Sequence, residues 1–251
     1  MRFSVCIPCF FPKLDFADAI RKVGALGYDA AEGWGWNGVN IDAVKLACGE
    51  TGVELVSMCT SSFRMTEPER REEWLEGLIK SCADAKKLGV HKLITQVGPD
   101  TGAPRTEQHA SIAEGLRRAI PILVESGVTL MIEPLNTLYD HRGYYLVSSA
   151  EAFDLVREAN HPQIKMVFDI YHQQVSEGNV INNITQNLDC ITHLHAAGSP
   201  GRHELQMGEN DYRFIFDAVG KAGYGELCGL EYFPTMDAEE SLIETKRIYG
   251  V

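Results

Sequence analysis

The chain has 251 residues, of which 45% are hydrophobic and 23% are charged, a composition typical of a globular protein with a substantial core. Its 35 acidic and 23 basic residues give a formal net charge of −12, which disfavours nucleic acid and anionic membranes as partners. No apolar stretch reaches the roughly 18 residues of a membrane span, and residues 1–5 lack the layout of a signal peptide, so we expect a cytoplasmic protein.

Short apolar runs alternate with amphipathic segments from the start of the chain. In the first half we expect strands at residues 2–8, 28–32, 53–59 and 90–96, and helices at residues 15–26, 41–51, 67–88 and 105–126. A glycine follows each of these helices and marks its C-terminal end: Gly27, Gly52, Gly89 and Gly127.

The second half continues the same alternation. Strands are expected at residues 128–133, 164–169, 190–195 and 227–231, and helices at residues 148–159, 180–188, 212–222 and 238–249. Eight strands alternating strictly with eight helices predict an α/β protein, a (β/α)8 TIM barrel spanning residues 1–251 as one domain. An open doubly wound sheet is the alternative.

Four predicted strands end on a side chain that can bind a metal. They are the last four strands, and their end residues are Glu133, Asp169, His195 and Glu231. In a barrel the carboxyl ends of the strands meet at the face that holds the active site. Three carboxylates and one imidazole suit Mn²⁺ or Mg²⁺, with Co²⁺ or Zn²⁺ as alternatives. One such residue alone would be interpreted as a hydrogen-bonded strand end, but four on consecutive strands predict one divalent metal ion.

Polar residues beyond these strand ends are expected to contact the substrate. His172 lies three residues past Asp169, in the loop that we expect there, where it can reach a substrate hydroxyl or orient a metal ligand. Arg202 lies in the loop after residues 190–195 and is a cation in an acidic mouth, able to hold a hydroxyl or carboxylate oxygen. The alternative for Arg202 is a surface salt bridge, which contributes little to stability.

The stretch after the second predicted strand offers further substrate contacts. Glu32 stands at the strand tip and can bind a hydroxyl, while Trp34 and Trp36 follow at the rim, where they can flank a sugar-like ligand. The same stretch, Gly33–Gly38, matches G-x-G-x-x-G, but indoles between the glycines would crowd a pyrophosphate. We therefore expect no dinucleotide site here.

Other histidines and cysteines are interpreted as structural. His193 shares the inward face of its strand with His195 and is expected to be a hydrogen-bonded core residue. The seven cysteines are scattered, mostly within apolar runs, as free buried thiols are. Cys6 and Cys9 match C-x-x-C, but because the next helix is expected to begin only near Asp15, a redox pair is not expected.

Six motifs resemble the hydroxypyruvate isomerase family, which lies within the xylose-isomerase-like barrels together with the ketose 3-epimerases. They are E-P-L-N at residues 133–136, G-Y-Y-L at 143–146, F-D-I-Y-H at 168–172, P-G-R-H-E at 200–204, G-E-N-D-Y at 208–212 and G-L-E-Y-F-P at 229–234. The resemblance implies a (β/α)8 barrel, a divalent metal, and Glu133 and Glu231 as a pair that exchanges protons. Asp169 and His195 would complete the metal shell, and Asn136 of the first motif is assigned to substrate binding.

The chain also departs from the pattern of hydroxypyruvate isomerases. These proteins tend to have glutamine where His195 stands, whereas 3-epimerases and inosose isomerase-like members have histidine. The segment between E-P-L-N and G-Y is one residue longer, with Asp140-His141-Arg142 where an x-Pro usually precedes the glycine. These departures leave both isomerisation and epimerisation open.

Together these features predict a metal-dependent isomerase that moves a proton through a cis-enediolate on a small hydroxy-carbonyl or sugar substrate. The absence of a Gly-rich phosphate cradle or Lys/Arg cluster beside the ligands favours an unphosphorylated substrate. Return of the proton to the neighbouring carbon would isomerise an aldose and a ketose. Return to the same carbon would make the enzyme a ketose 3-epimerase of the tagatose, allulose or ribulose type.

Two other classes are weighed against this interpretation. An endonuclease IV-like phosphodiesterase would need more metal-binding histidines and a basic surface, which the net charge of −12 disfavours. A non-catalytic binding barrel would leave the predicted ligands without a metal. Barrels of this kind often pair, so a homodimer or homotetramer is also expected.

Overall fold

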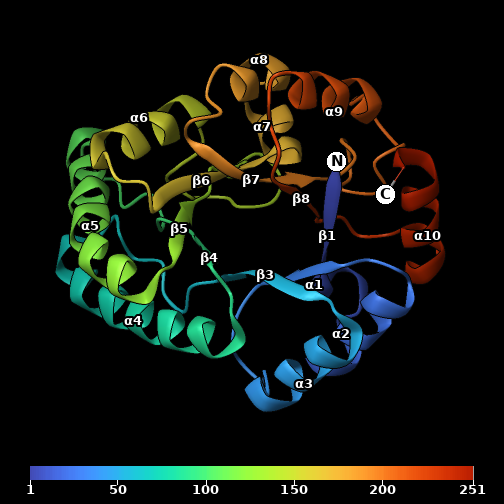
Figure 1. The fold of residues 1–251 in the computed structure, drawn as a ribbon. Helices are drawn as coiled ribbons and strands as arrows, with labels where there is room; N and C mark the ends of the chain where they lie inside the picture. Colours follow the sequence, from blue (N-terminus) through green and yellow to red (C-terminus); the bar gives the residue numbers. More distant parts are fainter. Residues whose placement is uncertain (251) are drawn as a thin grey trace.

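The computed structural model describes residues 1–250, in which eight parallel strands form a closed barrel, each paired with the next and the last with the first. Figure 1 shows the strands at the centre with the helices outside them. The strands are Arg2–Cys6 (β1), Ala30–Gly33 (β2), Glu54–Cys59 (β3), Lys92–Thr95 (β4), Thr129–Ile132 (β5), Ile164–Asp169 (β6), Ile191–Ala196 (β7) and Leu227–Leu230 (β8). The predicted (β/α)8 barrel is confirmed, and the open sheet is wrong.

The helices follow the predicted order, with several ends fixed by local chemistry. Gly52, Gly89 and Gly127 all adopt the left-handed conformation that ends a helix. The helices are Ile7–Phe10 (α1), Phe16–Ala25 (α2), Ile41–Thr51 (α3), Arg71–Leu88 (α4), Arg105–Ser126 (α5), Ser149–Ala159 (α6), Ile170–Ser176 (α7), Val180–Thr185 (α8), Tyr212–Lys221 (α9) and Ala238–Tyr249 (α10), with a 3₁₀ turn at Pro68–Arg70.

Two short helices break the strict alternation that the sequence predicts. The first strand ends at Cys6 rather than continuing to residue 8, and α1 begins at once. Pro8 fits there because N–H groups in the first turn of a helix have no acceptor within the helix, so proline, which lacks an N–H, loses no hydrogen bond. Similarly, α7 occupies the segment that we expected to be a loop after Asp169. Helices this short show too few turns for a hydrophobic period to reveal them.

Strand register and the inner core place the ends of the last three strands at one level. Asp169 pairs with His195, and His195 pairs with Gly229. Beneath them, buried side chains from four consecutive strands pack together inside the barrel: Cys59, Ile94, Met131 and Val167. The larger core lies between the strands and the surrounding helices. At the carboxyl end of the barrel, the paired strand ends therefore lie above a packed layer of buried side chains.

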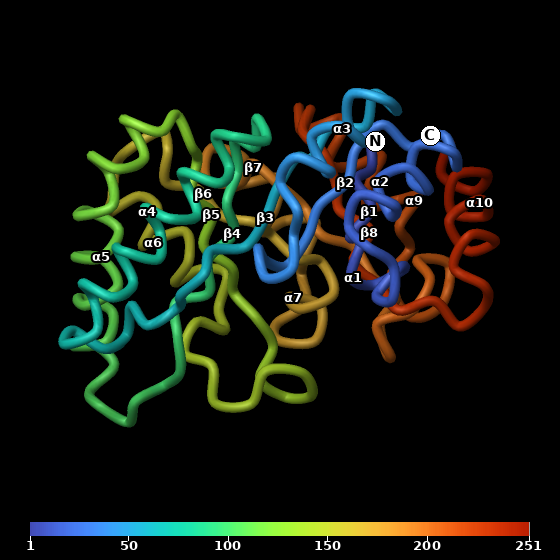
Figure 2. The backbone as a smooth tube through the Cα atoms, turned by 90° about the horizontal axis from the view of Figure 1, so that it is seen from below, coloured from blue at the N-terminus to red at the C-terminus, as the bar shows by residue number. Residues whose placement is uncertain are grey.

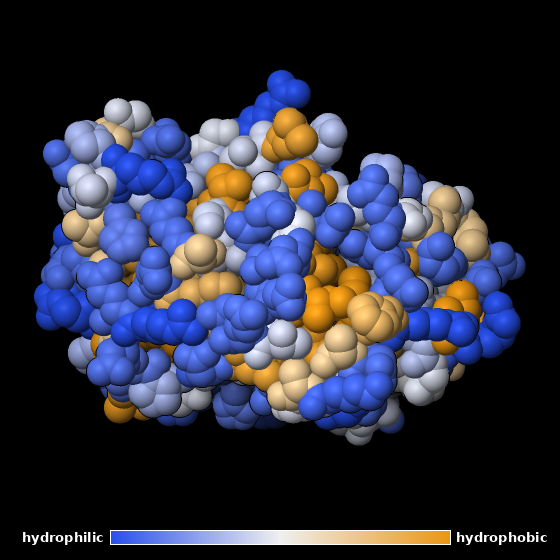
Figure 3. Space-filling model, turned by 90° about the horizontal axis from the view of Figure 1, so that it is seen from above, coloured by the Kyte–Doolittle hydropathy of each residue, from blue (hydrophilic) through white to orange (hydrophobic). Residues whose placement is uncertain are grey.

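The face of the molecule in Figure 3 is largely hydrophilic, with hydrophobic side chains in separate groups. Within residues 1–250 no helix combines the length and apolarity needed to cross a membrane. The loops after β4 and β5 project from the same end of the barrel, on the lower side of Figure 2.

Candidate functional site

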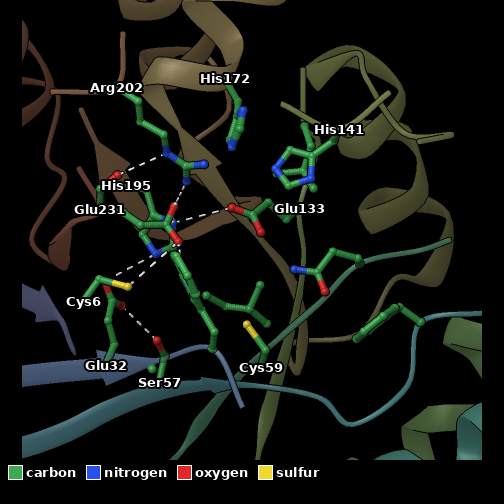
Figure 4. Close-up of a pocket in the computed structure, with 16 residues that line it drawn as sticks. Cys6, Glu32, Ser57, Cys59, Glu133, His141, His172, His195, Arg202 and Glu231 are labelled. Carbon is green, nitrogen blue, oxygen red and sulfur yellow. Dashed lines mark hydrogen bonds and ion pairs between the residues drawn. The ribbon is translucent and has the colours of Figure 1, made fainter. Parts of the chain in front are cut away.

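A cavity of about 260 Å³ opens at the carboxyl end of the barrel and contains most of the residues that the sequence assigns to a site. Its lining includes Glu32, Trp34, Glu133, His172, His195, Arg202 and Glu231. Figure 4 shows Arg202, Glu231 and His195 side by side, with Glu133 facing them. Asp169 lies beside this group, and Asn136 is completely buried outside the lining.

The four predicted metal ligands converge. Ligand atoms of Glu133, Asp169, His195 and Glu231 all lie within 4.8 Å of one another, and all four residues are buried. The Nδ1 atom of His195 is 3.5 Å from Glu133 Oε1 and 3.2 Å from Glu231 Oε2. A single imidazole nitrogen thus lies between two carboxylates whose residues directly follow β5 and β8.

Burial and mutual repulsion shape the ionisation of these groups. Burial raises the pKa of Asp169 to about 6, although the charge of Arg202 opposes the shift. Burial also raises the pKa of Glu133. At Glu231 burial acts in the same direction, but the charges of Arg202 and His195 outweigh it and hold the pKa well below its usual range. Two carboxylates of one cavity therefore differ in their affinity for a proton.

The donor atoms fit a divalent cation. Among the described residues, Asp169 Oδ2 and both ring nitrogens of His195 are buried without a hydrogen-bond partner. Buried polar atoms without partners are rare, and a catalytic role or a bound ion is among the explanations for them. Three carboxylates and one imidazole match the preferences of Mn²⁺, Mg²⁺ or Zn²⁺. These four residues could hold such an ion.

Asp169 also caps a helix, and it uses only one of its two side-chain oxygens to do so. Its side chain accepts a hydrogen bond from the backbone N–H of His172 at 3.0 Å and thereby caps α7. This bond uses Oδ1 and leaves Oδ2 directed at the cluster. The strand-ending carboxylate and the start of α7 are thus one structural feature.

Arg202 lies inside the site, so the surface salt bridge that we held as its alternative is wrong. Its side chain is buried, and Nη2 donates to Glu231 Oε2 at 2.5 Å and lies 3.9 Å from Asp169 Oδ2. The indole N–H of Trp34 donates to the other oxygen, Glu231 Oε1, at 2.6 Å. Both carboxylate oxygens of Glu231 are therefore held in place.

Glu32 lies at the Nε2 side of the His195 ring, whereas Glu133 and Glu231 lie at the Nδ1 side. Its Oε2 accepts from Ser57 Oγ at 2.9 Å and lies 2.8 Å from His193 Nε2, while Oε1 lies 3.5 Å from Nε2 of His195. The prediction that His193 is a hydrogen-bonded core residue is confirmed. Sequence analysis missed the role of Gly229.

A side chain at Gly229 could not coexist with this arrangement. A Cβ atom there would lie 2.0 Å from Glu32 Oε1 and 2.7 Å from His195 Cδ2. The close approach of Glu32 to His195 therefore requires glycine. An isolated glycine inside the apolar run that leads to Glu231 was a usable signal, since glycine within a strand often marks a close approach.

His172 is the neutral donor of the site, and Asn136 sets its tautomer. The Nδ2 and backbone N of Asn136 lie 2.6 and 3.4 Å from Nδ1 of His172, so that nitrogen accepts. Burial lowers the pKa of His172 well below its usual range, with Arg202 adding to the shift. A neutral ring that accepts at Nδ1 carries its proton on Nε2, which faces Asp169 Oδ2 at 3.6 Å.

The two sequence patterns set aside earlier have structural roles in the fold. Cys6 and Cys9 are free and buried. Although α1 begins directly after Cys6, contrary to our expectation, burial and the hydrogen bond with Cys9 raise the pKa of the Cys6 thiol. A reactive redox thiol needs the opposite shift. In the Gly33–Gly38 stretch, the Trp36 indole donates to the Cys59 carbonyl at 2.9 Å and anchors the loop.

Comparison with known proteins points to one family. A family model described as "Xylose isomerase-like TIM barrel" matches residues 20–247. The hydroxypyruvate isomerase of Escherichia coli (strain K12) is 30% identical over 251 residues, covering 96% of this chain and 97% of that protein. The 2-oxo-tetronate isomerase of Cupriavidus necator is 35% identical over 132 residues, covering 53% of this chain and 50% of that protein.

The solved structures agree on the architecture. The crystal structure of an AP endonuclease, family 2, from Brucella melitensis has a TM-score of 0.91 with 24% identity and covers 96% of both chains. At this identity the likeness concerns the fold alone.

Proposed function

This chain belongs to the xylose isomerase-like TIM barrel family, and from that premise we propose that it is a metal-dependent isomerase of a small hydroxy-carbonyl substrate, as its hydroxypyruvate isomerase relative suggests. One observation carries the proposal. Glu133 and Glu231 flank the same imidazole nitrogen within one buried cavity, and their pKa values shift in opposite directions. Such pairs are typical of sites that move protons at neutral pH.

The residues of the site have different roles in the proposed reaction. A divalent ion held by Glu133, Asp169, His195 and Glu231 would polarise the substrate carbonyl and acidify the neighbouring C–H bond. Glu133 and Glu231 exchange that proton between carbon positions through a cis-enediolate. The Nε2–H of neutral His172 and the Arg202 guanidinium donate to the oxygens on which negative charge develops. Trp34 keeps the Glu231 carboxylate in one orientation.

A ketose 3-epimerase is the second candidate, and one residue favours it. His195 stands where hydroxypyruvate isomerases tend to have glutamine, and the histidine resembles the 3-epimerases in this respect. Both reactions begin with the same proton removal. They differ in whether the proton returns to the neighbouring carbon or to the opposite face of the same carbon.

Proton NMR in D₂O with Mg²⁺-loaded enzyme tests the proposal and separates the two candidates. Hydroxypyruvate, tetruloses, ketopentoses and ketohexoses would be offered in turn. Deuterium at C2 or C3 of hydroxypyruvate, or at C1 or C2 of a ketose, with an aldehyde product would support the isomerase. Deuterium at C3 of a ketose with an inverted ketose as product would support the epimerase. Both candidates would be contradicted if no substrate gained carbon-bound deuterium with Mg²⁺ and if a product assay with Mn²⁺ and Co²⁺ also detected no product.

Glu231→Gln should lower turnover by roughly 10²–10⁴-fold, because the amide cannot accept the proton. The matched control is Glu209→Gln, which changes an exposed carboxylate in the loop after β7 and should leave turnover unchanged. Melting temperatures of both variants would show that the fold is retained. A Glu231→Gln protein with near-normal turnover would remove Glu231 from the proton transfer.

A further inference from the structure

A second cavity of about 480 Å³ adjoins the first at the carboxyl end of the barrel. The two cavities share four lining residues: Phe63, Gln96, Leu135 and His141. Figure 4 shows His141 on the Glu133 side of the reacting cluster, away from Glu32. A molecule whose reacting carbons lie at Glu133 and Glu231 can therefore extend past His141 into the second cavity.

The second cavity is basic, although the whole chain carries a net charge of −12. Two arginines, Arg64 and Arg142, and the imidazole of His141 line it, and no carboxylate does so within the described part of the chain. Arg64 forms an ion pair with Glu67 at 2.8 Å. Arg142 is exposed, and within residues 1–250 its side chain makes neither a hydrogen bond nor an ion pair. One cation of this cavity thus remains unneutralised.

The wall that carries Arg142 is tied to the reacting cluster. An antiparallel bridge joins Pro99 and Tyr144, and the backbone N–H of Asp100 donates to the Gly143 carbonyl at 2.7 Å. The Tyr144 hydroxyl then donates to the backbone carbonyl of Glu133 at 2.8 Å. The loops after β4 and β5, which project together in Figure 2, therefore hold this wall at a fixed position relative to Glu133.

We propose that the second cavity is a subsite for an anionic group, a carboxylate or a phosphate, at the end of the substrate remote from the reacting carbons. Arg142 binds this group directly, and Arg64 and His141 complete the basic wall. The inference rests on the proposed function and narrows it to sugar acids or sugar phosphates longer than three carbons. An arginine fits either anion because its planar fork matches both geometries.

Arg64 lies in the loop after β3 and Arg142 in the loop after β5, so they are far apart in the sequence. Our expectation of an unphosphorylated substrate assumed that no basic residues lie beside the predicted ligands. The fold removes that reason, because both arginines line the cavity that adjoins these ligands.

The test compares ketohexoses that differ only at C6, where they end in a hydroxymethyl group, a carboxylate or a phosphate. Dissociation constants would be measured by calorimetry with Mg²⁺-loaded wild-type protein and with Arg142→Gln. We expect at least one anion to bind roughly 10- to 100-fold tighter than the neutral ketose, as a charge-assisted hydrogen bond allows. Arg142→Gln should remove this advantage and leave the neutral ketose unaffected. The tighter anion identifies the group that the subsite takes.

Arg117→Gln is the matched control, since it changes an exposed arginine of α5 whose partner among the described residues is Glu114 on its own helix. Equal affinity for all three ketoses, no binding of any, or an equal loss in both variants would overturn the subsite. Carbon-bound deuterium is followed in the same samples. An anion that binds through Arg142 without any exchange would contradict the proposed isomerase while leaving the subsite intact.

Discussion

Glu231 and Glu133 are held very differently, although both belong to one cluster. Arg202 and Trp34 fix both oxygens of Glu231. Within the described part of the chain, no hydrogen bond fixes the Glu133 carboxylate in this way; it lies 3.5 Å from His195. A clamped carboxylate keeps one orientation toward the substrate, whereas an unclamped one can follow a proton to a different carbon. This asymmetry suits a reaction in which a proton is taken at one position and returned at another.

Glu32 offers a test of the metal site that does not depend on turnover. Its carboxylate faces the nitrogen of His195 that points away from the cluster, the position from which an outer residue fixes ring orientation and raises ligand basicity. Glu32→Gln should weaken Mn²⁺ binding by roughly 10- to 100-fold, measured by calorimetry.

Ser57→Ala is the control for this prediction. It removes the 2.9 Å hydrogen bond to Glu32 but keeps the negative charge beside His195, so Mn²⁺ affinity should fall much less. If Glu32→Gln bound Mn²⁺ as tightly as the wild-type protein, Glu32 would have no part in orienting His195.

At the scale of elements, α7 and the cluster of candidate metal ligands share Asp169. The side chain both caps the helix and directs one free oxygen at the cluster. Asparagine caps a helix about as well as aspartate, whereas alanine costs about 1 kcal/mol. In the metal-free protein, Asp169→Ala should therefore be about 1 kcal/mol less stable to urea than Asp169→Asn, since both lose the charge but only alanine loses the cap.

Both Asp169 variants should bind Mn²⁺ more weakly than the wild-type protein, because each loses a charged ligand. Removing one of three clustered carboxylates also relieves repulsion, the repulsion that contributes to the raised pKa of Asp169. Unfolding by urea and Mn²⁺ titration on the same samples would separate the two tasks. Equal destabilisation by both substitutions would show that the cap does not hold α7.

The loop of residues 136–148 is also secured as an element. Tyr145 donates to Glu151 of α6 at 2.7 Å, and the Arg105 guanidinium lies 4.3 Å from the Tyr145 ring centre. Contacts to α5 and α6 thus hold this loop from outside, and the Tyr144 bonds hold it from inside. The basic wall of the second cavity is built on a braced loop rather than a free one.

At the scale of the whole molecule, the closed barrel concentrates buried negative charge at one end. Glu32, Glu133, Asp169 and Glu231 all lie there, with Arg202 as the buried arginine among them. Burial of unpaired carboxylates is costly, and a bound cation offsets that cost. We therefore expect the metal to stabilise the fold as well as the reaction.

Adding Mn²⁺ to chelator-treated protein should raise the melting temperature. At a free concentration of about 100 times Kd the gain is about 2.7 kcal/mol, which corresponds to roughly 5–10 °C for a chain of this size. Calorimetric melting with Mn²⁺, with Mg²⁺ and with EDTA would measure it. Asp169→Asn should show a smaller shift, and an unchanged wild-type melting temperature would argue against a cation in this cluster.

The sequence by itself determined the barrel and the side chains at its strand ends. Strand and helix periodicity is local, so the alternation could be recognised segment by segment. The short helices α1 and α7 were not predicted. Each candidate ligand ended its own apolar run, and closure of the barrel then brought Glu133, Asp169, His195 and Glu231 together without further information.

Only the tertiary structure decided what surrounds these ligands. The bond from Trp34 to Glu231 and the approach of Glu32 over Gly229 join residues from opposite ends of the chain, and Arg202 is buried against Glu231 from a different loop. The presence of Arg64 and Arg142 in the lining of one cavity depends on how two loops pack above the barrel. No local period encodes such contacts, because loop positions follow from strand register and barrel closure, which are properties of the whole sheet.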